Sequence, residues 1–155
     1  MNATSRAKRN FWAQTGSMLL LSGLMAAAYI GSATRPISKE ELAIETSDLR
    51  SLSAEGAELS AQLSSGKLTD AFFFGHVELM HDKIATARET LESPNTDTEV
   101  PLELDKARRL AERIDGELEK LSADEHYAGQ AKQGFTALVE PLRQLEDELK
   151  QGAEK

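Results

Sequence analysis

The sequence contains no cysteine, which limits the chemistry open to the chain. Disulfides, covalently attached c-type haem, cysteine-ligated iron–sulfur clusters and cysteine-ligated zinc are all excluded. Aromatic residues are also few, at 5% of the chain. A chain of this composition depends on the packing of aliphatic side chains for its stability.

Acidic residues are missing from the N-terminal part of the chain, where none precedes Glu40. Three of the 18 basic residues precede Arg35, so the remainder carries 15 basic against 26 acidic residues, a net charge of −11. A surface of this charge repels nucleic acid, which we exclude as a partner, and suits a basic protein partner.

Charged side chains are absent between Arg9 and Arg35. The uncharged stretch 11–33 is long enough for a helix that crosses about 30 Å of hydrocarbon. Basic residues in 1–10 place the N-terminus in the cytoplasm, so 34–155 lies outside it, in the periplasm if the cell is bacterial. We therefore predict a single-pass membrane protein with a transmembrane anchor at 11–33.

The expected ends of this span carry aromatic side chains that favour the membrane interface, namely Phe11, Trp12 and Tyr29. Inside the span, Gly23, Ala27 and Gly31 recur every four residues and form one smooth stripe. Such a stripe lets a second transmembrane helix approach closely. We therefore expect another integral membrane protein as a partner.

A cleavable signal peptide is the alternative interpretation of the same segment. Its strongly apolar part, 18–30, is short, and the small residues Gly31, Ser32 and Ala33 that follow resemble a cleavage site. In that case the mature protein is a soluble secreted or periplasmic protein. Export from the cytoplasm is common to both interpretations.

The remainder of the sequence predicts an all-α fold. Pro36 interrupts helical geometry, so 34–38 is expected to be a hinge. Ser38 and Glu41 match a capping box, which predicts a helix from about residue 39 to about Ser64. Hydrophobic residues at steps of three and four define four stripes, which predict an antiparallel, up-down-up-down four-helix bundle over 39–151. The expected core positions are Leu42, Leu49, Leu52, Gly56, Leu59 and Leu63; Phe73, Val77, Met80, Ile84, Ala87 and Leu91; Leu104, Ala107, Ala111, Ile114, Leu118 and Leu121; and Ala131, Phe135, Leu138, Leu142, Leu145 and Leu149.

Two features disturb this regular pattern. Pro141 lies inside the fourth stripe, so we expect the fourth helix to be kinked or broken there. Phe72, Phe73 and Phe74 are consecutive and cannot all face one seam, so at least one ring lies at the bundle edge. Such a ring either caps the open end of the core or contacts a partner, and we consider Phe72, Phe74 and His76 as a possible partner surface.

No set of residues in the sequence predicts a catalytic or cofactor site. His76 and His81 are five residues apart, which does not suit two ligands of one metal ion on a helix. The His76 and Met80 pair shares one helix, whereas axial haem ligands approach from opposite sides. Phosphate-binding loops and nucleophile elbows are absent from the sequence. We therefore predict no enzyme activity, no metal and no cofactor.

These observations favour a non-catalytic, membrane-anchored accessory or structural subunit of a larger membrane protein complex, with an acidic helical domain outside the cytoplasm. The alternative is an extracytoplasmic module that binds or senses a ligand or acts as a chaperone, secreted if the signal is cleaved. The sequence itself resembles no family in specific motifs.

Overall fold

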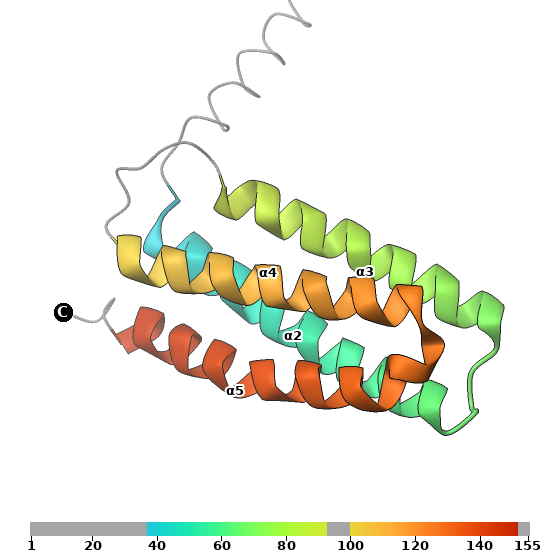
Figure 1. Cartoon of the computed structure of the whole chain (residues 1–155). Coiled ribbons are helices and arrows are strands. Elements are labelled where there is room, and N and C mark those ends of the chain that lie inside the picture. Colours follow the sequence, from blue (N-terminus) through green and yellow to red (C-terminus); the bar gives the residue numbers. More distant parts are fainter. Residues whose placement is uncertain (1–36, 93–99, 152–155) are drawn as a thin grey trace, which may run out of the picture. The chain divides into compact units, whose positions relative to one another are not determined.

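The structure is a computed structural model that describes residues 37–92 and 100–151. These residues form four long helices, α2 (Lys39–Ser64), α3 (Asp70–Leu91), α4 (Pro101–Ala123) and α5 (Ala128–Gln151), with a short 3₁₀ helix, η1 (Glu125–Tyr127), between the last two. No strand occurs in this part of the chain. Consecutive helices run in opposite directions (Figure 1). The prediction of an all-helical domain with four helices is confirmed.

Local chemistry fixes the ends of α2. The Ser38 hydroxyl accepts a hydrogen bond from the Glu41 amide at 3.1 Å, and the Glu41 carboxylate accepts one from the Ser38 amide at 2.9 Å. This is the predicted capping box. At the other end Gly66 has φ of 66°, a left-handed conformation that glycine adopts without steric cost. The helix therefore begins and ends where the sequence indicates.

The helix α5 runs through Pro141 without interruption. The expectation that Pro141 breaks the fourth helix into two is therefore wrong. A proline inside a helix costs about 3 kcal/mol, but Leu138, Leu142 and Leu145 around it are each almost fully buried. Burial of each leucine side chain contributes about 1.5–3 kcal/mol, which together exceeds the cost of the proline.

The core consists of the predicted stripes. Every predicted core position of α3, α4 and α5 is buried, and only Leu63 of α2 is half-buried. The fit is closest for α3, whose buried residues are the six of its predicted stripe. Spacing of three and four residues therefore placed the apolar face of each helix correctly.

Hydrophobic spacing does not predict the seam between α2 and α5, although these two helices make the most extensive contact in the bundle. Thr46, Ser53 and Ser60 of α2 are fully buried there. The Thr46 and Ser60 hydroxyls each donate to the carbonyl four residues earlier, at 2.7 Å. The Ser53 hydroxyl instead donates across the seam to the carbonyl of Phe135, at 2.8 Å. The small side chains let the two helices approach closely without leaving unpaired hydroxyls.

One carboxylate is buried in the same seam. Glu146 of α5 is 5% exposed, and Arg50 Nε of α2 lies 3.0 Å from its Oε2 atom. Lys150 pairs with the other oxygen of the same carboxylate. An acidic side chain is buried at this position because two cations compensate its charge.

None of the described helices is both long enough and apolar enough to cross a membrane. The predicted anchor at 11–33 and residues 34–36 of the predicted hinge at 34–38 lie outside the described residues. The same holds for the six residues singled out in the anchor, namely Phe11, Trp12, Gly23, Ala27, Tyr29 and Gly31.

Candidate functional site

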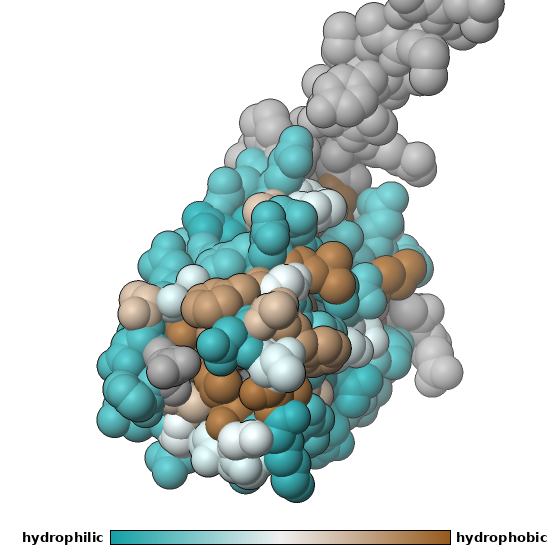
Figure 2. Space-filling model, turned by 90° about the vertical axis from the view of Figure 1, so that its right-hand side faces the viewer, coloured by the Kyte–Doolittle hydropathy of each residue, from teal (hydrophilic) through white to brown (hydrophobic). Residues whose placement is uncertain are grey.

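Apolar side chains gather at the end of the bundle where α2 joins α3 and α4 joins α5. Figure 2 looks onto this end and shows hydrophobic residues grouped over it. Phe72 and Phe74 are its most exposed large side chains, at 55% and 54%, and Leu63, Leu68 and Tyr127 are partly buried against the core. We call these five residues the apolar end.

The three consecutive phenylalanines divide between the core and the surface. Phe73 is 1% exposed and lies in the core stripe of α3. Because neighbouring helical residues are about 100° apart, Phe72 and Phe74 point to either side of it. The sequence pattern therefore placed Phe73 in the core correctly. It predicted at least one ring at the bundle edge, and both neighbours of Phe73 are exposed.

His76 extends the surface around Phe72. Its ring stacks on that of Phe72, with centroids 5.5 Å apart and planes 15° apart. Its Nε2 atom lies 2.8 Å from the Glu55 carboxylate of α2, which also accepts a hydrogen bond from Lys83 at 3.1 Å. The structure thus brings Phe72 and His76 together, whereas Phe74 packs edge-on against Phe73. The Glu55 contact escaped sequence reasoning because it joins two helices.

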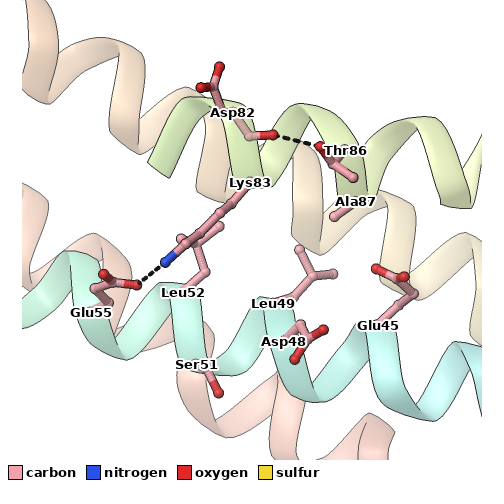
Figure 3. A pocket seen from close by; sticks show the side chains of 10 residues that line it. All are labelled: Glu45, Asp48, Leu49, Ser51, Leu52, Glu55, Asp82, Lys83, Thr86 and Ala87. Atoms are coloured by element: carbon pink, nitrogen blue, oxygen red, sulfur yellow. Dashed lines mark hydrogen bonds and ion pairs between the residues drawn. The ribbon is translucent and has the colours of Figure 1, made fainter. Parts of the chain in front are cut away.

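A groove of about 530 Å³ runs between α2 and α3 (Figure 3). Leu49, Leu52 and Ala87 contribute its apolar surface. Carboxylates outnumber cations along it. Four acidic residues line the groove, Glu45, Asp48, Glu55 and Asp82, although the Asp82 carboxylate points away from it (Figure 3), and the only lining cation, Lys83, reaches across to Glu55. The groove therefore has a negative potential.

One carboxylate of this groove has a perturbed acidity. Burial raises the pKa of Glu45 above its ordinary value, and the negative charge of Asp48 raises it further. Both effects disfavour the ionised form of Glu45. A cation placed in the groove would oppose them.

The remaining histidine of α3, His81, also lies in a contact between helices. Its Nδ1 atom is 3.7 Å from the Asp115 carboxylate of α4, which Arg88 of α3 also binds. Within the described residues, no three histidines or carboxylates are grouped so as to hold a metal ion.

Comparisons of the chain with protein-family models, with curated proteins and with solved structures found no match.

Proposed function

We propose that the chain is a non-catalytic, membrane-anchored accessory subunit whose helical bundle binds a partner protein through the apolar end. The observation that carries this proposal is the exposure of Phe72 and Phe74, each more than half accessible to water beside a core that already contains Phe73. Burial of a phenylalanine side chain contributes about 1.5–3 kcal/mol, so a partner that covers both rings gains affinity from them.

The anchor belongs to the same proposal. The uncharged segment 11–33 is proposed to hold the chain in the membrane, with the bundle outside the cytoplasm and, in a bacterium, in the periplasm. Gly23, Ala27 and Gly31 are proposed to pack against another integral membrane protein. The partner is then engaged twice, once within the bilayer and once at the apolar end.

The test is purification of the full chain from its native membranes in a mild detergent. We expect it to be extracted with a stoichiometric partner. Replacing Phe72 and Phe74 by serine should remove that partner, because the rings no longer contribute apolar area. The matched control is Leu102→Ser, since Leu102 is 72% exposed and lies in the first turn of α4, which begins at the opposite end of the bundle (Figure 1).

Two outcomes contradict the proposal. One is a wild-type chain that leaves the membrane as a lone monomer. The other is a partner retained equally by the Phe72→Ser/Phe74→Ser variant and by wild type. Leucine substitutions at Gly23, Ala27 and Gly31 test the contribution of the anchor separately.

A second function, extracytoplasmic binding or sensing of a ligand, is favoured by the groove between α2 and α3. Its volume of about 530 Å³ suits a small molecule, and the excess of acidic over basic residues in its lining favours a cationic one. A ligand of this kind raises the melting temperature because it binds the folded state. A panel of polyamines that leaves the melting temperature unchanged contradicts this function.

A further inference from the structure

A second groove, on the opposite side of the bundle from the acidic one, runs between α4 and α5. It consists of two adjoining hollows of about 340 and 250 Å³, which share Arg113 in their linings. Four basic residues of α4 line it at steps of three, four and seven residues, so they form one row along the helix: Lys106, Arg109, Arg113 and Lys120. We call this feature the arginine groove.

The other wall of the arginine groove comes from α5 and is mostly apolar, with Gln144 and Glu148 as its polar residues. Pro141 and Leu145 line one hollow, and Ala137 and Leu138 line the other. Pro141 has no amide hydrogen to donate to the carbonyl of Ala137, and its ring adds apolar surface. The groove therefore combines an apolar surface on α5 with a row of cations on α4.

Glu117 and Gly134 shape one end of the groove. The Glu117 side chain lies so close to Gly134 that the Cβ atom of any other residue there would collide with it. The Tyr127 hydroxyl donates to the Glu117 carboxylate at 2.9 Å, and Lys120 binds the same group at 2.9 Å. Glu117 is therefore held against α5. It neutralises Lys120 at the end of the row rather than Arg109 or Arg113 at its centre.

The cations of the row are unequally compensated. Lys106 pairs with Glu148 at 2.7 Å and Lys120 with Glu117 at 2.9 Å. Within residues 37–92 and 100–151, Arg109 and Arg113 have neither an ion pair nor a hydrogen bond to a carboxylate. The groove thus presents two available guanidinium groups in a chain whose net charge is −8.

We propose that the arginine groove binds an acidic amphipathic helix of a partner protein. From Lys106 to Lys120 the row is about 21 Å long at 1.5 Å per residue, which matches roughly four turns of a docked helix. Arg109 and Arg113 are four residues apart, as are two glutamates on one face of such a helix. Each guanidinium can bind a carboxylate through two hydrogen bonds.

The apolar residues of the same docked helix pack against Pro141 and Leu145, as amphipathic helices do in hydrophobic grooves. The rest of the bundle is acidic and repels such a helix, which confines binding to this groove. The site lies on α4 and α5, apart from Phe72 and Phe74 of α3. It is therefore a binding site beyond the one proposed above.

The proposal is tested with the full chain in a mild nonionic detergent. The probe is a fluorescein-labelled 18-residue peptide with leucines at steps of three and four and glutamates four apart beside them. Fluorescence anisotropy should show binding to wild type. The double variant Arg109→Glu/Arg113→Glu should bind at least about tenfold more weakly, because attraction becomes repulsion at both positions.

The matched control is Lys132→Glu/Arg143→Glu, which makes the same change of net charge at two exposed positions of α5 outside the groove. It should bind the peptide within about twofold of wild type, since the residues that line the groove are unchanged. Circular dichroism and melting temperature establish that both variants are folded.

Three results overturn the proposal. The first is no binding of the peptide to wild type. The second is an equal loss in both double variants, which indicates attraction to net charge alone. The third is complete competition by inorganic phosphate or by double-stranded DNA at the concentration of the peptide, which assigns the groove to a small anion or to nucleic acid.

Discussion

At the scale of single residues, Gly56 shows how packing overrides helix propensity. Alanine at an open position of a helix is about 1 kcal/mol more favourable than glycine. At Gly56, however, an added Cβ atom would lie 3.0 Å from three atoms of the Phe135 ring, which is itself fully buried. Overpacking of a core costs about 1–3 kcal/mol. We expect Gly56→Ala to lower the free energy of unfolding in urea.

The control for this prediction is Gly75→Ala. Gly75 lies on the exposed face of α3, and an added Cβ atom there meets nothing within 4 Å. We expect it to raise the free energy of unfolding by about 0.5–1 kcal/mol. Equal stabilisation by both substitutions would show that the Phe135 ring moves aside at little cost.

Glu45 gives a residue-scale prediction about pH. Its pKa is raised in the folded state by burial and then by Asp48. Ionisation of Glu45 therefore costs the folded state more than the unfolded state, and stability is lost as pH rises through the raised pKa. We expect Glu45→Gln to raise the melting temperature near pH 7 and to leave it unchanged near pH 3, where the carboxyl group is protonated in both states.

Differential scanning calorimetry at both pH values checks this prediction. Glu89→Gln, at an exposed position of α3, serves as the control for the loss of one negative charge. An equal gain from the two substitutions near pH 7 would assign the effect to net charge. A gain from Glu45→Gln that persists near pH 3 would assign it to packing of the amide.

At the scale of elements, Pro141 weakens a helix that tertiary contacts hold together. Replacing it by alanine restores the amide that donates to the carbonyl of Ala137 and removes a cost of about 3 kcal/mol. The half-buried proline ring is lost, which offsets part of the gain. We expect Pro141→Ala to raise the free energy of unfolding by about 1–2 kcal/mol in urea denaturation. A less stable variant would show that packing of the ring outweighs the missing hydrogen bond.

The existence of the helices and the direction of their apolar faces were predictable from the sequence. Ser38 and Glu41 mark the start of α2 through contacts within one turn, and the stripe from Phe73 to Leu91 lies within one helix. Such signals are local. The sequence left a kink and a break at Pro141 as alternatives. Only the break is wrong, and it could not be excluded from the sequence because the leucines that keep α5 intact act through contacts with other helices.

Pairing between helices was not predictable, because periodicity gives a face and not its neighbour. Ser53 is compatible with an exposed surface until Phe135 is known to lie opposite it, and the spacing that predicted Gly56 as a core position did not identify Phe135 as its neighbour. The same limit applies to the candidate site. The register of α3 placed Phe73 inside and Phe72 outside, but the pairing of His76 depends on Glu55 of α2.

At the scale of the whole bundle, packing is unevenly distributed. The first and last of the four described helices, α2 and α5, make the most extensive contact, through the seam of Thr46, Ser53, Gly56 and Ser60. The helix α3 packs against α4 and, less extensively, against α2, from which the 530 Å³ groove separates it along part of its length. The stability of α3 therefore relies on fewer contacts than the stability of the other three long helices.

Ion pairs do not compensate for the less extensive packing of α3. Those that join α3 to its neighbours involve Lys83, Arg88, His76 and His81, all at least one quarter exposed. Pairs with this exposure contribute roughly 0–1 kcal/mol each and weaken in salt. The six buried side chains of α3 therefore provide most of its attachment.

We therefore expect α3 to open before the other helices of the bundle. Native-state hydrogen exchange, read by mass spectrometry at low urea, should give opening free energies for α3 roughly 1–3 kcal/mol below those for α2 and α5, because local stability follows local packing. Equal values for all helices would instead show that the bundle opens only as a whole. Since α3 carries Phe72 and Phe74, a partner bound at the apolar end should slow exchange in α3 first, by mass action on its closed state.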